Sequence, residues 1–340
     1  MLEKFNPFKA IVVSAGIVVI IAGLIAAKSI VIPLLLAGFI AIITAPLLFW
    51  LQSKGLNRAL ALIIVLILIS LAFFATSYII GSSIGSFSKE LPLYEAKLSM
   101  QLKDSFSALE PLGITLSSES LNALLDPSRL MQITSVVFQG LSSLVTHGMM
   151  TLFLVVFMLL EASVLPSKLK LIHVDMMGHV SRFLTNVKHY MLLKTLFSLI
   201  TGLLISILLW LLDVHYALLF GLVAFLLNFI PNIGSIIAAI PAVILALIQL
   251  GSTTALMVAI GFILINILIG SIIEPKYMGE GLGISTLVVF ISLIFWGWVL
   301  GPVGMLLSIP LTVMVKIALE TQEQTRWIAT LLDADVTKKS

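Results

Sequence analysis

The chain has 340 residues, of which 60% are hydrophobic and 10% are charged, and its mean hydropathy is +1.20. A water-soluble domain does not keep such a surface in solution, so these values exclude a soluble enzyme or a soluble binding module. The formal charge is +3, and the basic residues stand in short loops beside apolar runs, which argues against a nucleic acid partner.

Apolar runs recur along the chain at lengths that cross a bilayer core about 30 Å thick, which takes roughly 20 helical residues. The expected spans are 10–27, 30–51, 59–85, 141–162, 191–213 and 216–230. Four later segments are short or contain glycine and proline, and they either cross or re-enter: 232–250, 254–273, 285–300 and 302–319. The sequence therefore predicts an all-α, polytopic membrane helical bundle with broken or re-entrant helices in its C-terminal half.

Three regions are expected from this pattern. Residues 1–85 form N-terminal membrane hairpins, residues 86–140 form an extracytoplasmic amphipathic helical segment, and residues 141–340 form the membrane core. The segment 86–140 has apolar residues at helical spacing, and it is too small to fold alone, so we expect it to pack on the bundle or on a neighbouring subunit. Within the core we expect a cytoplasmic interfacial helix at 163–190. The broken segments are 228–250 and 285–319.

Lysine and arginine in the short loops predict the orientation, because cytoplasmic loops carry an excess of both. They gather before the first expected span, in the loop 54–58, in the stretch 168–188 and in the C-terminal tail. All of these would be cytoplasmic, so both termini face the cytoplasm and the number of full crossings is even. The spans are most consistent with eight crossings.

The stretch 228–241 reads N-F-I-P-N-I-G-S-I-I-A-A-I-P and breaks an apolar run with prolines, a glycine and amides. Proline removes a backbone donor, so in lipid the freed backbone groups need partners, and transporters often build solute sites from such breaks. We expect a substrate pathway lined by Asn228, Pro231, Asn232, Gly234, Ser235, Pro241, Asn266, Ser285 and Thr286. The alternative, that the polar side chains only cap broken helix ends, stays open.

Ionisable residues within or beside the spans are a second group of candidates, because a charge near the bilayer centre is costly and usually faces protein or water. Glu274 stands where an apolar run stops at Pro275, and it is the first candidate for ion or proton coupling. Glu161 at the end of the fourth span and Lys194 at the start of the fifth are the others. A solvated interface position explains Glu274 equally well.

No enzyme, cofactor or metal site is expected. The chain has no cysteine, its histidines lack the H-E-x-x-H spacing of a zinc helix, and no G-x-x-x-x-G-K-[ST] phosphate loop occurs. Paired acids, histidines and serines do not gather at one depth as an intramembrane enzyme would require. Solute movement would then follow its own gradient or a coupled ion gradient.

The run from residue 220 to Pro241 resembles the run from residue 290 to Pro310, since each is apolar, breaks at proline and glycine, and ends in Ile-Pro. Paired breaks of this kind are typical of transporters built from two repeats. Two independent helix corners would give the same pattern, so both interpretations stay open.

Several motifs together resemble the autoinducer-2 exporter family. They are F-M-L-L-E at 157, P-N-I-G-S at 231, I-P-A-V at 240, I-I-E-P-K-Y-M-G at 272 and the long run that begins G-L-G-I-S-T at 281. The resemblance implies a multi-pass protein of the bacterial inner membrane, homo-oligomeric and pentameric, that exports the small polar signal of quorum sensing. Some members resemble sodium (lithium)/proton antiporters, which is the alternative function. A non-transporting membrane scaffold or an intramembrane enzyme is the second alternative.

Overall fold

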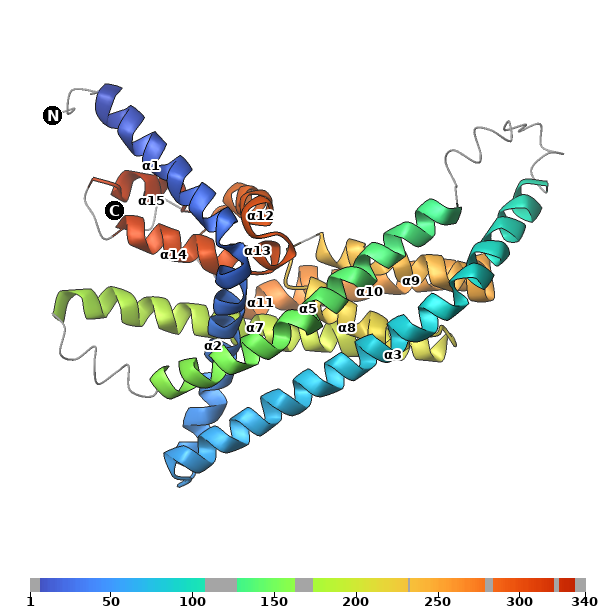
Figure 1. Ribbon diagram of the computed structural model, residues 1–340, viewed down its shortest axis with the longest axis horizontal. Helices are drawn as coiled ribbons and strands as arrows, with labels where there is room; N and C mark the ends of the chain where they lie inside the picture. The colour runs from blue at the N-terminus through green and yellow to red at the C-terminus, as the bar shows by residue number, and fades with distance from the viewer. Residues whose placement is uncertain are drawn as a thin grey trace. The chain divides into compact units, whose positions relative to one another are not determined.

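The computed structural model describes residues 7–107, 127–162, 174–231, 233–278, 284–320 and 324–333, and all regular structure in these ranges is helical (Figure 1). The helices are α1 (Pro7–Ala26), α2 (Lys28–Ser53), α3 (Arg58–Ser107), α5 (Pro127–Ala162), α7 (Val174–Leu211), α8 (Ala217–Leu227), α9 (Gly234–Leu250), α10 (Ser252–Ile265), the π-helix η2 (Asn266–Ile273), α11 (Glu274–Met278), α12 (Thr286–Leu300), α13 (Pro302–Leu306), α14 (Ser308–Glu320) and α15 (Arg326–Leu331). The expected all-α fold is confirmed.

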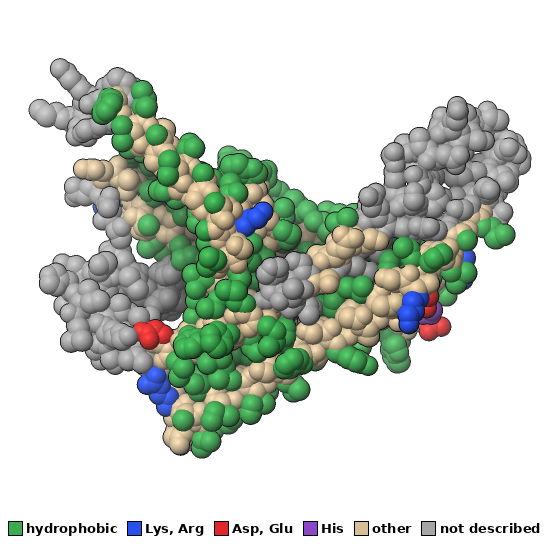
Figure 2. Space-filling model, in the orientation of Figure 1, with side chains coloured by type: hydrophobic (Ala, Val, Ile, Leu, Met, Phe, Trp, Pro, Cys, Tyr) green, Lys and Arg blue, Asp and Glu red, His purple; other side chains and the backbone are tan. Residues whose placement is uncertain are grey.

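Four stretches within these helices are long and apolar enough to cross a membrane: Lys28–Ser53, Arg58–Tyr94, Val187–Leu211 and Ser252–Tyr277. Shorter apolar helices cover Ile11–Ala26, Gly148–Glu161, Ala217–Leu227, Gly234–Leu250 and Thr286–Leu300. Hydrophobic side chains cover much of the described surface in Figure 2, and charged side chains are few there. Exposing so large an apolar surface to water is unfavourable, whereas exposing it to lipid acyl chains is not. The chain is a multi-pass membrane protein.

The chain forms two compact units. Unit 1 comprises Met1–Ser53, Met150–Lys188 and Leu282–Ser340, and unit 2 comprises Lys54–Met149 and His189–Gly281. The core of unit 2 is built mainly from α8, α9 and α10, with Phe220, Ala242 and Val258 fully buried in it. Gly251 (φ +91°) turns the chain between α9 and α10, a conformation that glycine adopts without the cost of a Cβ.

Two helices differ from the elements that the sequence suggests. Helix α3 continues without a break from the expected span into the segment that begins at residue 86, and it ends at Ser107 after passing through Pro92. The stretch after Gly85 contains good helix formers and no further glycine up to Ser107, so the single proline does not end the helix. Helix α7 begins at Val174 and continues through the expected interfacial stretch into the span that follows.

Candidate functional site

The break after α8 is a tight corner in which the chain packs against itself. The N–H of Ile230 donates to the carbonyl of Leu227 (2.8 Å), and the N–H of Gly234 donates to the carbonyl of Ile230 (3.3 Å). A Cβ at Gly234 would lie 1.7 Å from the carbonyl oxygen of Leu227, so a residue with a side chain does not fit there. Asn232 lies outside the described residues. The corner sets Asn228 at the C-cap of α8.

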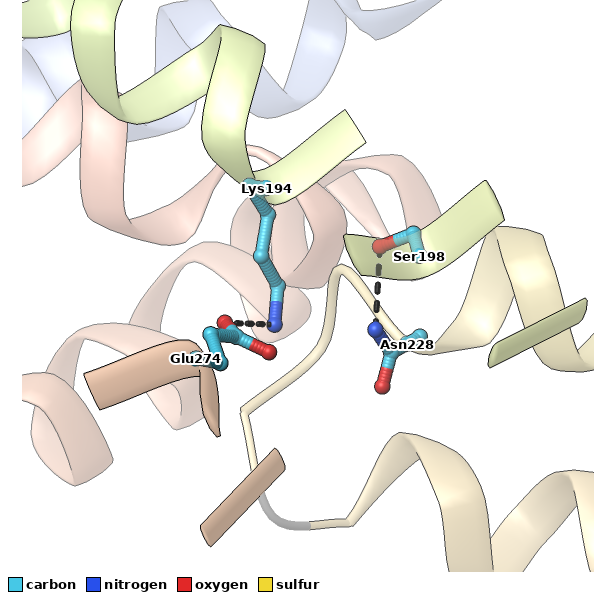
Figure 3. Close-up of polar contacts among 4 residues, drawn as sticks. All are labelled: Lys194, Ser198, Asn228 and Glu274. Carbon is cyan, nitrogen blue, oxygen red and sulfur yellow. Dashed lines mark hydrogen bonds and ion pairs between the residues drawn. The ribbon is translucent and has the colours of Figure 1, made fainter. Parts of the chain in front are cut away.

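Asn228 is buried and directs its amide at α7. Its Nδ2 donates to the Oγ of Ser198 over 3.0 Å, and Asn228 is only 7% exposed (Figure 3). In Figure 3 the amide oxygen points away from Ser198, and in the described part of the chain no donor reaches this oxygen. The Asn228 amide therefore lies beside the Ser198 hydroxyl with its oxygen directed elsewhere, and an amide oxygen of this kind can accept a hydrogen bond from a polar ligand.

One helical turn before Ser198, Lys194 forms an ion pair across unit 2. Its Nζ lies 2.6 Å from Oε1 of Glu274, and the two side chains are 8% and 10% exposed. Both residues were expected from sequence as coupling candidates, and the structure brings them together (Figure 3). Removing two charges from water costs free energy that their mutual attraction only partly recovers. A buried ion pair therefore adds little net stability, and stabilisation alone does not account for its presence.

Three buried polar side chains of α7 share one face. Lys194, Ser198 and Thr201 follow at intervals of four and three residues, which places them on adjacent turns of the same side. All three are buried, although the rest of this helix is mostly apolar. Glu274 and Asn228 contact this face from two other segments. Unit 2 thus contains a buried ion pair and a buried amide that contact the same face of α7.

A π-helix leads into Glu274. The segment η2 (Asn266–Ile273) follows α10 directly, and α11 begins at Glu274. A Cβ at Gly270 would lie 3.1 Å from Oδ1 of Asn266, so glycine leaves room for that amide. Single-turn π segments inside α-helices are frequent at functional sites, since they redirect side chains without ending the helix. Asn266, expected in the pathway, therefore begins the segment that presents Glu274 to Lys194.

The other expected residues lie in different settings. Ser235 is partly buried in the first turn of α9, and Pro241 is buried within that helix. Ser285 caps α12, because its Oγ accepts the N–H of Val288 over 3.3 Å. The sequence left open whether Ser285 lines a pathway or caps a helix end, and in the structure it caps α12. Thr286 and Glu161 are exposed, and with Ser285 they belong to unit 1. Pro231 is partly buried in the corner.

Besides the π-helix, two features were missed by reasoning from the sequence. Ser198 was not named, although a serine one turn after Lys194 in an apolar span was a usable signal. The second feature is a network in unit 2, in which Oε2 of Glu90 accepts hydrogen bonds from Tyr94 and, over 3.1 Å, from Tyr216. Gln249 donates to the hydroxyl of Tyr94 over 3.2 Å. Glu90 and Tyr94 are four residues apart on α3, a spacing at which side chains meet, whereas Tyr216 and Gln249 are distant in sequence and no spacing indicates their contact.

Comparison with known proteins gives a consistent result along the whole chain. It is 41% identical to the AI-2 transport protein TqsA of Escherichia coli (strain K12) over 337 residues, which covers 98% of each chain. It is also 41% identical to a putative transport protein of Haemophilus influenzae over 341 residues, again 98% of each. The putative transport protein YhhT of Escherichia coli (strain K12) is 38% identical over 321 residues, 94% of this chain and 92% of the relative. The family described as AI-2E family transporter matches residues 15–324, and the chain belongs to that family of membrane transporters.

Proposed function

We propose that the chain is a secondary transporter or facilitator that exports the small polar signal autoinducer-2 across the bacterial inner membrane. The membership in a transporter family and the printed name of the Escherichia coli relative support this substrate. The distribution of lysine and arginine supports a topology with both termini in the cytoplasm. A transporter of this family is expected to act without the catalytic groups of an enzyme.

The observation that carries the proposal is the buried hydrogen bond between Asn228 and Ser198. Autoinducer-2 is a small, uncharged and polyhydroxylated molecule, so its recognition needs donors and acceptors rather than a formal charge. The amide oxygen of Asn228 accepts a solute hydroxyl, and the hydroxyl of Ser198 either donates or accepts. A few convergent polar groups among apolar side chains are what a site for such a solute requires.

The wider pathway that we propose draws on the corner after α8, the π segment η2 and the start of α12, as the sequence pattern suggested. Its members besides Asn228 and Ser198 are Pro231, Asn232, Gly234, Ser235, Pro241, Asn266, Ser285 and Thr286. Hydroxyl and amide groups of this kind would hydrogen-bond a polar solute in place of water, which offsets the cost of removing its hydroxyl groups from water.

The test is efflux of labelled autoinducer-2 from vesicles reconstituted with equal amounts of each variant. Asn228→Ala should lower the initial rate about tenfold or more, the scale of a lost hydrogen bond of roughly 1.4 kcal/mol or above. Ser198→Ala should lower it several-fold. Ser82→Ala is the matched control, because Ser82 is exposed and its Oγ bonds the carbonyls of Tyr78 and Ile79 in its own helix. Wild-type efflux by the Asn228 variant would overturn the proposed site.

A second candidate function is sodium (lithium)/proton antiport, and the buried pair of Lys194 and Glu274 favours it. A carboxylate that exchanges a proton for a cation would need a buried position with one compensating charge, and Glu274 has both. Glu161 is the other acidic candidate. In the same vesicles, added sodium or lithium should collapse an imposed proton gradient if the chain is an antiporter. Glu274→Gln should abolish that collapse, whereas sodium-independent efflux of autoinducer-2 would decide for the exporter.

We also propose that the chain works as a homo-oligomer, pentameric as the family resemblance implies. Exposed apolar side chains on helices such as α1 leave surface that a second subunit or lipid must cover. Native mass spectrometry of the protein released from nanodiscs measures the subunit number directly. A purely monomeric species that retains transport would contradict this part of the proposal.

A further inference from the structure

The chain after α14 folds back onto unit 1 and is fixed there. Lys316 of α14 forms an ion pair with Asp333, and both side chains are nearly buried. The N–H of Ser285 donates to the carbonyl of Leu332 over 3.1 Å, and the Oγ1 of Thr325 donates to the carbonyl of Leu319 over 2.8 Å. Helix α15 lies between these contacts, so its position on unit 1 is set from both of its ends.

The outward side of α15 is divided into an apolar sector and a polar sector. Ala329 faces the protein and is 1% exposed, whereas Trp327 is 63% and Leu331 is 69% exposed. At about 100° per residue, Trp327 and Leu331 point in nearly one direction, and Arg326 and Thr330 point in another, roughly 100° away. Arg326 and Thr330 are exposed as well. A helix with this pattern can lie along a boundary between an apolar and a polar medium.

The contact with Ser285 places α15 at the start of an apolar stripe. Helix α12 exposes Leu287 (69%), Ile291 (55%), Ile294 (71%) and Trp298 (66%), which share one face of the helix. In a membrane protein such a face is directed at lipid. The stripe starts two residues after Ser285, whose backbone holds Leu332 at the end of α15. Helix α15 therefore lies at the level where the lipid-facing surface of unit 1 begins.

We infer that α15 is an interfacial helix that inserts Trp327 and Leu331 into the bilayer at the boundary between headgroups and acyl chains. Arg326 and Thr330 face the headgroups and water, where the guanidinium contacts lipid phosphate. Tryptophan favours this boundary because its ring is apolar and its N–H is polar, and arginine is attracted to anionic lipid. The inference concerns how the chain binds lipid, and it holds whichever solute is transported.

The chain has no cysteine, so a single introduced cysteine is the only position that a thiol-reactive label modifies. Leu331→Cys and Thr330→Cys each carry one nitroxide label in the full-length protein reconstituted in liposomes of phosphatidylethanolamine and phosphatidylglycerol. Collisions with oxygen, which concentrates in lipid, are compared with collisions with a water-soluble nickel chelate. We expect the oxygen-to-nickel ratio to be roughly fivefold or more higher at position 331 than at position 330, as for the two sides of an interfacial helix.

Two outcomes would overturn the inference. Equal, nickel-dominated ratios at both positions would show that α15 lies in water. Protection of position 331 from both reagents would show that protein, such as a second copy of the chain, covers this sector. Trp327→Cys and Arg326→Cys repeat the comparison on the same two sectors, so a label that disturbs one position does not decide the result. Both pairs are exposed, which leaves the contacts that fix α15 intact.

Discussion

Gly202 of α7 and Gly221 of α8 pack backbone against backbone in unit 2. A Cβ on Gly202 would lie 2.6 Å from the carbonyl oxygen of Gly221, and a Cβ on Gly221 would lie 2.5 Å from that of Gly202. Small residues at a crossing let two membrane helices approach closely. Gly202 stands one turn after Ser198, so this close crossing also sets the distance at which Asn228 meets Ser198.

We expect Gly202→Ala to separate α7 from α8 and to weaken transport together with stability. The added methyl group meets backbone, which does not rotate away, and overpacking of this kind costs about 1 to 3 kcal/mol. Thermal unfolding in detergent and vesicle efflux measure the two effects. Gly85→Ala is the control, because nothing lies within 4 Å of its Cβ position and the exchange should be neutral or slightly stabilising. Equal stability of the two variants would contradict the close crossing.

The pair of Lys194 and Glu274 should show strong coupling in a double-mutant cycle. Either Lys194→Met or Glu274→Leu alone leaves one buried charge without its partner, which destabilises by about 3 to 5 kcal/mol. Lys194→Met combined with Glu274→Leu removes both charges and should recover much of the stability, because the site becomes uniformly apolar. Unfolding in detergent gives the three free energies. Additive losses in the double variant would mean that the 2.6 Å contact does not persist in the protein.

Hydrophobic runs predicted the helices well, because the length and composition of a span follow from the thickness of the bilayer. The sequence also indicated the break after α8 and named Lys194 and Glu274 separately. It did not indicate that these two residues pair, since periodicity describes one helix and carries no information on which helices are neighbours. The π-helix at Asn266–Ile273 was missed for a related reason, because the segment has no proline and continues an apolar helical run, so no local pattern marks the change from α to π geometry.

The two runs that resemble each other in sequence, 220–241 and 290–310, also share a local packing geometry. A Cβ at Gly234 would lie 1.7 Å from the carbonyl oxygen of Leu227, and a Cβ at Gly304 would lie 1.9 Å from that of Trp296. In each corner a glycine packs under the carbonyl of the preceding helix, so the similarity of the two sequences reflects a shared packing requirement. The polarity of the flanking residues differs between the corners. Asn228 stands three residues before Pro231, whereas the apolar Val299 stands three residues before Pro302.

The ion pair between Lys316 and Asp333 should control the attachment of the C-terminal segment. Lys316→Asp places two carboxylates together, so we expect faster proteolysis after α14 and a loss of about 2 kcal/mol or more in stability. Lys316→Asp combined with Asp333→Lys restores opposite charges and should recover most of the protection. Limited proteolysis followed by intact-mass analysis measures the attachment. If the protein with the reversed pair is cleaved as fast as the single variant, the ion pair does not attach the C-terminal segment.

The hydrogen bond from Tyr216 to Glu90 should stabilise unit 2 in a pH-dependent way. Burial raises the pKa of Tyr216 above its ordinary value, and the phenol donates to Glu90 only while it keeps its proton. The stabilisation is therefore complete below the unfolded pKa of about 10 and declines as the pH rises beyond it. Tyr216 also has φ +61°, and Tyr216→Phe keeps that strain while it removes the hydroxyl alone.

We expect Tyr216→Phe to cost about 1 kcal/mol at pH 7, the usual worth of one hydrogen bond, and to cost progressively less above about pH 10. Thermal unfolding of both proteins across this pH range gives the difference at each pH. Tyr78→Phe is the matched control, because Tyr78 is 76% exposed and its exchange should change stability little at any pH. Unchanged stability of Tyr216→Phe at pH 7 would mean that the hydrogen bond to Glu90 contributes nothing measurable.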